Sequence, residues 1–456
     1  MTTTRIRSTF GKGALFAAAA LTAVQIASFG PATQAHAATP TIGVSVDGIA
    51  QTGWKVKTIQ QTEFVPVRLL AAAIGASVAW DESTSTVSLT QGTRVVKLTN
   101  GSKAASVNGK QTQLKFAPVE KSNTLYVPAV AVGQLFGADV AEDIAASKLN
   151  IVPKLHPYAD GNKQGYLNVF GEAVIAAKYE AANGFSEGLA IVKQDGKYGY
   201  INALGEAVIQ PQFDEAYDFS DGLALVDKAG VSTYINVKGE TVLSPSGYDE
   251  LYDFSEGLAL VRKGDLFGYI DHTGKEVIPA QLEDAFYFSE GVAAVQIEGR
   301  YGYIDRTGNV VIKAVYQSAS DFEAGLGLVQ SEGENGEGSF GFIDLNGKAS
   351  IATAYAKAFS FSEGVAAVEG DDTFFYVNSI GENVLQTAYE DVGSFHEGLA
   401  SFEDNGRYGY IDRNGKVVIA AKYDSAGDFN KGYAVVETGA GSFLINAQGV
   451  IVAEAP

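Results

Sequence analysis

Cysteine is absent from this 456-residue sequence, which also contains one methionine, two tryptophans and four histidines. The absence excludes disulfides, thiolate nucleophiles and cysteine-ligated zinc, so packing must supply the stability. Basic residues are also scarce, because 33 Lys and Arg stand against 53 Asp and Glu, which gives a formal charge of -20. Such a charge repels nucleic acid and anionic membranes, so we expect neither as a partner. A cationic partner or a diffuse cloud of metal ions stays open.

Long apolar runs occur only at the beginning of the sequence. Three basic residues precede a mostly apolar stretch at 14–29, and Ala35-His36-Ala37 then forms a small-x-small cleavage site. This order is typical of a secretory signal peptide, so we predict one at 1–37 and a secreted or cell-envelope location. A membrane anchor needs about 20 apolar residues, and Gly30-Pro31 interrupts this run. We therefore expect no transmembrane span after cleavage.

Residues 42–152 form a separate region with an internal duplication. Val65-Pro66 leads through an alanine-rich run to Gly75, and Val127-Pro128 leads through a similar run to Gly137. Proline suits the first turn of a helix, and glycine suits the left-handed residue just after its end. A strand-like run follows each predicted helix, and an Asp-Gly or Asn-Gly hairpin signal precedes it. We predict a small α+β domain made of two similar halves.

This region resembles the bacterial domain family named after the N-terminal stalk of copper amine oxidase. The shared features are the Val-Pro-x-x-x-Leu segment, the helix that ends in Gly-Ala, and the Val-Ala-Trp-Asp turn at 78–81. The resemblance implies a non-catalytic envelope or stalk module. The second half departs from the pattern, because Val130 stands where the first half has Arg68, and Glu142 stands in place of Trp80. The second half therefore lacks the side chains on which any surface built from those residues would depend.

The histidines argue against copper chemistry. A copper site needs several converging imidazoles, and the sequence after the leader has only His156, His272 and His396. These residues occupy different positions of the repeat described below or of the segment before it, so periodicity does not bring them together. No Asn-Tyr-Asp or Asn-Tyr-Glu segment that could mature into a quinone occurs. We predict no cofactor and no metal site.

Residues 155–456 consist of about nine copies of a unit of about 34 residues. One column is phenylalanine in every copy, at spacings of 34, 35, 34, 34, 39, 34 and 34 residues. A repeat with such short strands needs one large anchor to join its neighbours, so we assign this column to the core rather than to sugar-stacking platforms. The column consists of Phe185, Phe219, Phe254, Phe288, Phe322, Phe361, Phe395 and Phe429.

Two further columns predict tight turns. The residue three positions after each phenylalanine is always glycine, which indicates positive φ or a close backbone approach. The residue before that glycine is usually acidic but is alanine or lysine in two copies, so we interpret it as a solvated face rather than a catalytic carboxylate. A later column holds five Asn and four Asp, which favours a turn over calcium ligation. The glycines are Gly188, Gly222, Gly257, Gly291, Gly325, Gly364, Gly398 and Gly432.

The copies resemble the WG repeat, also called the KWG repeat, of bacterial proteins. The pattern Gly-Tyr-Ile-Asp-x-x-Gly-x-x-Val-Ile followed by Phe-Ser-Glu-Gly-Leu-Ala-x-Val is nearly complete at 254–312 and 395–423. The tryptophan that names the family is replaced by tyrosine or phenylalanine, and its glycine becomes Thr233, Phe375 or Phe443 in three copies. The resemblance implies no activity, since the family is a repeat without a known catalytic centre.

Strand counting gives an architecture for the array. Each unit has three short predicted strands and a linking loop of about a dozen residues. A propeller blade normally has four strands, so we favour an open solenoid or superhelix, with a propeller-like ring as the alternative. The 39-residue spacing comes from an insertion at 331–339. Its acidic residues Glu332, Glu334 and Glu337 form a candidate binding loop.

Two functional classes remain. We favour an exported, non-enzymatic binding or scaffolding protein that associates with the envelope through the N-terminal domain. Its array would present a multivalent surface to protein or cell-wall glycan. The alternative is a hydrolase of cell-wall polymer or polysaccharide, which would need one carboxylate pair that breaks the repeat. Asp284 and Asp371-Asp372 are the only candidates for that pair. The sequence does not define the oligomeric state.

Overall fold

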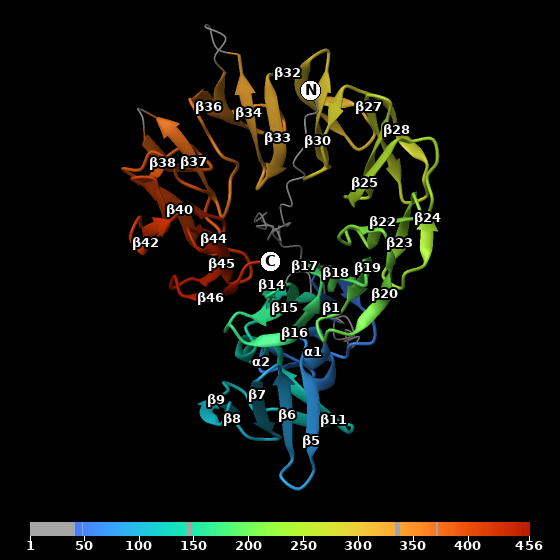
Figure 1. Cartoon of the computed structure of the whole chain (residues 1–456), viewed down its shortest axis with the longest axis vertical. Coiled ribbons are helices and arrows are strands. Elements are labelled where there is room, and N and C mark those ends of the chain that lie inside the picture. Colours follow the sequence, from blue (N-terminus) through green and yellow to red (C-terminus); the bar gives the residue numbers. More distant parts are fainter. Residues whose placement is uncertain (1–41, 48, 144–147, 333–337, 371–372) are drawn as a thin grey trace, which may run out of the picture. The chain divides into compact units, whose positions relative to one another are not determined.

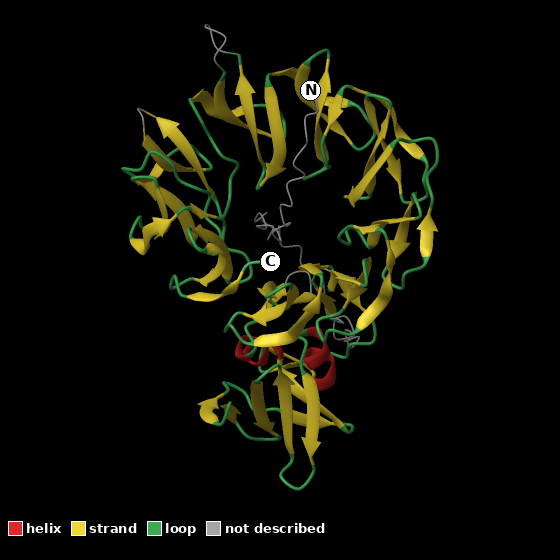
Figure 2. Cartoon of the chain, in the orientation of Figure 1, coloured by secondary structure: helices red, strands yellow, loops and turns green. Residues whose placement is uncertain are grey.

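The protein is described by a computed structural model, which covers residues 42–47, 49–143, 148–332, 338–370 and 373–456. Its helices are α1 (Val67–Ala73) and α2 (Ala129–Leu135), and nearly all other elements are strands (Figures 1 and 2). The predicted fold class is confirmed, since a small α+β region precedes a β-repeat array. The predicted leader at 1–37 lies outside the described residues. No helix of the described part is long and apolar enough to cross a membrane.

Three sheets surround one hydrophobic core in the region before the repeats. Their strand orders are β12-β13-β1-β2, β10-β11-β4-β3 and β5-β6-β7-β8-β9. Strands β1 and β13 pair in parallel, so the first and last strands of the region are neighbours. The strands are β1 (Gly43–Val46), β2 (Ile49–Gln51), β3 (Lys57–Ile59), β4 (Thr62–Pro66), β5 (Ser77–Asp81), β6 (Thr86–Gln91), β7 (Arg94–Thr99), β8 (Ala104–Val107), β9 (Lys110–Gln113), β10 (Val119–Lys121), β11 (Thr124–Pro128), β12 (Asp139–Asp143) and β13 (Lys148–Val152).

The register of β4 against β11 shows the internal duplication directly. Val65 lies opposite Val127, and the proline after each valine lies opposite the residue before the other. The two Val-Pro segments therefore pair antiparallel about their valines, and each continues into a seven-residue helix. The prolines are the N-cap residues, one position before the first helical turn in which the sequence placed them. Gly75 and Gly137 follow the helices with φ of +73° and +72°, as expected for left-handed C-terminal caps.

Each repeat of the array forms a small antiparallel sheet. The sheet orders are β17-β18-β19-β20, β21-β22-β23-β24, β25-β26-β27-β28, β29-β30-β31-β32, β33-β34-β35-β36, β37-β38-β39 and β40-β41-β42. The strands are β14 (Leu155–Asp160), β15 (Lys163–Asn168), β16 (Ala173–Tyr179), β17 (Ala181–Ser186), β18 (Leu189–Gln194), β19 (Lys197–Ile201), β20 (Ala207–Phe213), β21 (Glu215–Ala216), β22 (Leu223–Lys228), β23 (Val231–Asn236), β24 (Thr241–Leu243), β25 (Glu250–Ser255), β26 (Leu258–Lys263), β27 (Leu266–Asp271), β28 (Glu276–Leu282), β29 (Asp284–Ala285), β30 (Val292–Ile297), β31 (Arg300–Asp305), β32 (Val310–Tyr316), β33 (Ser318–Glu323), β34 (Leu326–Ser331), β35 (Ser339–Asp344), β36 (Ala349–Tyr355), β37 (Val365–Gly370), β38 (Thr373–Asn378), β39 (Asn383–Gln386), β40 (Leu399–Asp404), β41 (Arg407–Asp412), β42 (Val417–Tyr423), β43 (Ser425–Ala426), β44 (Tyr433–Thr438), β45 (Gly441–Asn446) and β46 (Ile451–Glu454).

The expectation of three strands in each repeat holds for the sheets β37-β38-β39 and β40-β41-β42 and is wrong for five others. The segment that the sequence assigned to a linking loop pairs with the next strand, as β17 does with β18, and so adds a fourth strand to five of the sheets. A register shift between Ala182 and Phe185 interrupts the alternation of this strand, which is why a search for period-two patterning misses it. Strand counting therefore gives four strands in these five sheets and three in two others.

The two ends of the array share one sheet. Strand β14 of the first repeat pairs with the final strand β46 at Ala159 and Glu454. The resulting seven-stranded sheet has the order β16-β15-β14-β46-β45-β44-β43. Tyr433 of the last repeat also donates a buried hydrogen bond from its hydroxyl to the carbonyl oxygen of Asn168. The first and last strands of the array are therefore ladder neighbours.

The glycine of each Tyr-Gly-Tyr strand allows the last strand of the repeat to bend over it. At Gly302, a Cβ atom would lie 2.5 Å from the carbonyl oxygen of Ile312. The last strands of repeats with this glycine all have seven residues. Where Thr233, Phe375 or Phe443 replaces the glycine, the last strand has only three or four residues. The exceptions in the sequence therefore shorten the ladder locally.

An aromatic pair joins each repeat to the next. The phenylalanine three residues before each turn glycine packs against a tyrosine of the preceding repeat, or against Phe342 in one copy, with ring centroids 4.7–5.0 Å apart. The tyrosine hydroxyl then donates to a carbonyl oxygen of the next repeat, as Tyr303 does to Ser320 at 2.7 Å. Such a pair contributes about 0.5–1.5 kcal/mol beyond the buried area. The exposed fractions are Phe185 5%, Phe219 1%, Phe254 1%, Phe288 2%, Phe322 2%, Phe361 3%, Phe395 1% and Phe429 3%.

Candidate functional site

The Glu-Gly turn of each repeat binds the turn of the next repeat. Glu290 and Gly291 have consecutive positive φ values of +53° and +85°, which is the geometry of a type I′ hairpin turn. Glu290 Oε2 accepts a hydrogen bond from the Gly325 N–H at 2.8 Å, and Ser289 Oγ donates to the Phe322 carbonyl oxygen at 2.8 Å. The interpretation of these carboxylates as only a solvated face is therefore incomplete, because Glu290 also joins two repeats.

The same carboxylate contact recurs along the array. All eight turn glycines have φ between +79° and +90°. The acceptor and donor residues of the other cross-repeat bonds are Glu187 with Gly222, Asp221 with Gly257, Glu256 with Gly291, Glu363 with Gly398, and Glu397 with Gly432. These residues use their polar groups to hold the repeats together.

The junction between the last and first repeats replaces this bond. Lys431 occupies the acidic position of the last repeat, and its ammonium donates to the Phe185 carbonyl oxygen at 2.8 Å. Burial lowers the pKa of this lysine, against the attraction of Asp47 and Asp218. Asp47, from the N-terminal region, accepts the hydrogen bond of the Gly188 N–H at 3.2 Å. Asp47 thus accepts the hydrogen bond that, between other repeats, a carboxylate of the preceding repeat accepts.

The Asn/Asp column forms turns. The carboxylate of Asp305 accepts hydrogen bonds from the backbone N–H of Thr307 at 2.8 Å and of Asn309 at 3.0 Å. The hydroxyl of Thr307 also donates a hydrogen bond to this carboxylate, and this bond is the largest cause of its lowered pKa. Together the hydrogen bonds lower the pKa of Asp305 to about 2. Asn202 makes the corresponding backbone contacts with Leu204 and Glu206. Both residue types therefore serve the same local purpose.

Of the array's candidates for catalysis and for a binding loop, only Asp284 and Glu332 are described, and each contacts its own local partner. Tyr301 Oη donates to Asp284 Oδ2 at 2.8 Å, and the Ala285 N–H donates to Asp284 Oδ1 at 3.1 Å. Glu332 forms an ion pair with Arg300. Glu334, Glu337 and Asp371-Asp372 lie outside the described residues.

The three histidines lie in different surroundings. His156 packs against the Tyr433 ring, His272 against the Phe254 ring, and His396 lies 3.3 Å from the carboxylate of Asp428. Among the described residues, no three or more His, Asp or Glu side chains are grouped so as to hold a metal ion.

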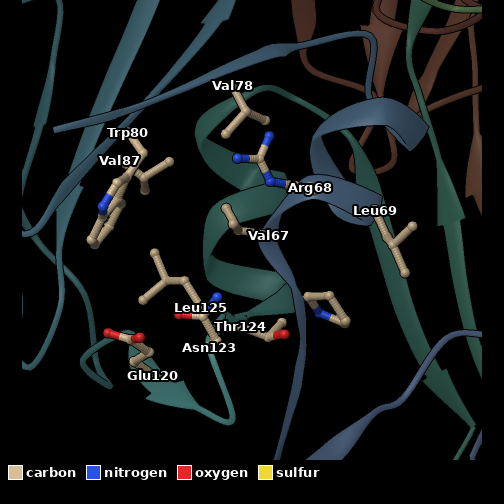
Figure 3. A pocket seen from close by; sticks show the side chains of 11 residues that line it. Val67, Arg68, Leu69, Val78, Trp80, Val87, Glu120, Asn123, Thr124 and Leu125 are labelled. Atoms are coloured by element: carbon tan, nitrogen blue, oxygen red, sulfur yellow. The ribbon is translucent and has the colours of Figure 1, made fainter. Parts of the chain in front are cut away.

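A cavity of about 440 Å³ in the N-terminal domain is lined by residues of both halves of the duplication. Helix α1 contributes Val67 at its first turn, strands β5 and β6 contribute Val78 and Val87, and the β10–β11 hairpin contributes Leu125 (Figure 3). Val67, Val87 and Leu125 are buried core residues, at 5%, 1% and 8% exposure. The cavity therefore has an apolar floor that belongs to the domain core.

Polar and aromatic side chains stand around this floor. Arg68 follows Val67 on α1, and Figure 3 shows its guanidinium directed toward Val78. Trp80 is 41% exposed and lies opposite Val87 in the β5–β6 ladder. Glu120 lies at the other end of the group of lining side chains from Arg68 (Figure 3). Within the described part of the chain, the Arg68 side chain makes no hydrogen bond or ion pair.

Sequence reasoning singled out two of these residues without assigning them a site. Arg68 and Trp80 are two of the positions at which the second half of the domain departs from the first. Arg68 and Trp80 are neighbours through α1 and β5, whereas the β4–β11 pairing brings the β10–β11 hairpin to the same cavity. Glu120 carried no signal, because its place follows from that tertiary pairing alone.

Family models match both parts of the chain. The Copper amine oxidase N-terminal domain matches residues 52–151. The WG containing repeat matches eight segments, at 165–198, 198–231, 233–267, 267–301, 301–334, 340–372, 374–408 and 408–440. A search of curated proteins found no match.

The similar solved structures are remote. Hsv2p of Kluyveromyces lactis has 10% identity and a TM-score of 0.32, over 51% of this chain and 92% of that one. A structure described as the eukaryotic initiation factor has 12% identity and a TM-score of 0.37, over 74% and 90%. The extracellular domain of BT4673 from B. thetaiotaomicron has 10% identity and a TM-score of 0.28, over 92% and 66%. At such scores these likenesses carry no argument about fold or function.

The repeat matches cover more than half of the chain, and each spans parts of two neighbouring sheets of the array. The chain therefore belongs to the WG-containing repeat family and carries a copper amine oxidase N-terminal domain before its repeats.

Proposed function

We propose that this protein is an exported, non-enzymatic binding protein that attaches to the cell envelope through the cavity of its N-terminal domain. The cavity carries the proposal, because it combines an apolar floor with an exposed indole and a guanidinium that no described residue engages. Such a combination of apolar surface and a few oriented polar groups is typical of binding sites.

The array supports the proposal that the protein also serves as a scaffold. Its repeated Phe, Ser, Glu and Gly residues are engaged in contacts between neighbouring repeats, so they build the array rather than act on a substrate. Ligand contacts then fall to the variable surface between these columns, where several weak contacts can sum to useful avidity. That surface is acidic, since residues 155–456 contain 45 acidic and 19 basic side chains.

Isolated bacterial envelopes test the proposal. The chain without residues 1–37 should sediment with the envelopes and release no new reducing ends from purified cell-wall polysaccharide. Trp80→Ala should reduce the bound fraction at least tenfold, whereas Trp54→Phe, at the other tryptophan, should leave it unchanged. An unchanged bound fraction for Trp80→Ala would refute attachment through the cavity. Release of reducing ends would refute the non-enzymatic assignment.

A further inference from the structure

Strand β5 is an open sheet edge beside the cavity. It is the end strand of its five-stranded sheet. Its register against β6 is unbroken from Ser77 to Asp81, and four of its five residues are exposed. Natural proteins usually protect such an edge with lysine, proline, a bulge or a covering segment. Neither lysine, proline nor a bulge occurs in β5, so three of these four protections are missing from its outer edge.

The side chains of β5 place the cavity within reach of that further strand. Alternate residues of a strand share a face, so Val78 and Trp80 lie on the same side, and both line the cavity. A strand added at the β5 edge would direct every second side chain toward this same side. One of these side chains can enter the apolar space between Trp80 and Leu125.

Charge identifies a second requirement of the ligand. Arg68 stands at one end of the cavity and has no partner among the described residues. The domain around it is nearly balanced, with ten basic and eight acidic side chains in residues 42–152, whereas the array is strongly acidic. The negative charge of the array therefore repels an acidic ligand, whereas the nearly balanced N-terminal domain does not. A planar guanidinium suits a carboxylate, which it can bind through two N–H groups.

We propose that the β5 edge and the cavity bind an extended acidic peptide of a partner protein by strand addition. The peptide places an apolar side chain in the cavity and, two positions away on the same face, a carboxylate at Arg68. This inference rests on the proposed binding function and names the chemistry of its ligand. Strand addition supplies affinity through the main chain and specificity through the alternate side chains.

A glycan fits this site less well. The floor is formed by aliphatic side chains, and Trp80 is the one aromatic residue that lines the cavity. A sugar needs several hydrogen-bonding groups around its ring, whereas the lining offers only a few polar side chains. The open strand edge, by contrast, matches the regular spacing of a peptide backbone.

Selection from a phage-displayed library of random twelve-residue peptides tests the inference on the full chain. Enriched sequences should carry an apolar and an acidic residue two positions apart. A synthetic peptide of the enriched sequence should bind at least tenfold more weakly to Arg68→Glu and to Trp80→Ala. Lys97→Glu makes the same charge change at an exposed position outside the cavity and should leave binding unchanged. N-methylation of alternate peptide backbone nitrogens should abolish binding, because it removes ladder hydrogen bonds.

Envelopes treated with protease or with a muramidase separate the two ligand classes. Loss of attachment after protease alone agrees with a peptide ligand. Loss after muramidase alone would overturn the inference while leaving the proposed binding function intact. The inference would also be overturned if the selected peptides bind Arg68→Glu and Trp80→Ala as tightly as they bind the parent chain. A library that yields no enriched sequences would overturn it too. If untreated envelopes fail to bind, the proposed function fails, whatever the peptides do.

Discussion

Replacing Phe288 by alanine removes a ring that joins two repeats. Phe288 is 2% exposed, and its ring centroid lies 4.9 Å from that of Tyr269. Deleting a buried aromatic ring costs about 3–5 kcal/mol. Phe286, two residues earlier, is 38% exposed, so Phe286→Ala should cost about 1 kcal/mol or less. The Tyr269 hydroxyl donates to the Phe286 carbonyl, and the Ser255 hydroxyl to the Phe288 carbonyl. Both substitutions retain these acceptors, so the comparison isolates ring burial.

Urea denaturation followed by far-UV circular dichroism measures the two free energies of unfolding. Because a repeat array need not unfold in one step, hydrogen exchange read by mass spectrometry should accompany it. Phe288→Ala should lose protection in the sheets on both sides of the ring, β25-β26-β27-β28 and β29-β30-β31-β32. Equal costs for the two variants, or a cost below about 1 kcal/mol for Phe288→Ala, would refute the assignment of this column as the link between repeats.

Three further perturbations test separate contacts. Glu290→Ala should cost about 1 kcal/mol in urea denaturation, because the Gly325 N–H loses its acceptor; an unchanged midpoint would return this carboxylate to the solvated face. Ala159→Cys combined with Glu454→Cys should form a disulfide on mild oxidation, since the two residues are ladder partners and the chain has no other cysteine; a reduced pair would contradict the joined ends. The pKa of Asp305 is lowered to about 2, so its stabilisation is complete above about pH 4 and is lost as the pH falls through about 2. Asp305→Asn should therefore show a smaller loss of stability than the parent between pH 5 and pH 2, and identical pH profiles would contradict the turn contacts.

The repeat period was sufficient to predict the fold class, because a constant phenylalanine column requires a repeated core position. Local turn chemistry was equally accessible, since glycine at position 291 indicates a backbone that other residues rarely adopt. The first strand of each repeat was missed, because a bulge before Phe185 breaks the alternation that identifies strands. The role of Glu290 was also missed, because its partner is 35 residues away and depends on how the repeats stack.

The candidate site was harder to predict than the fold. Arg68 and Trp80 could be noticed as exceptions to the duplication, but only the pairing of β4 with β11 brings Glu120 and Leu125 to the same cavity. The openness of the β5 edge is a property of strand order, which the sequence alone does not define. The contact between Ala159 and Glu454 was inaccessible for a similar reason, since it depends on the accumulated geometry of all the repeats.

The central claim is that ligand binding takes place at Trp80, in the N-terminal domain. The chain has two tryptophans, so 5-fluorotryptophan labelling should give two ¹⁹F NMR signals, which Trp54→Phe assigns. On addition of the selected peptide to the full chain, the Trp80 signal should shift in proportion to the bound fraction while the Trp54 signal stays in place. A peptide that binds and leaves the Trp80 signal unmoved would contradict the claim.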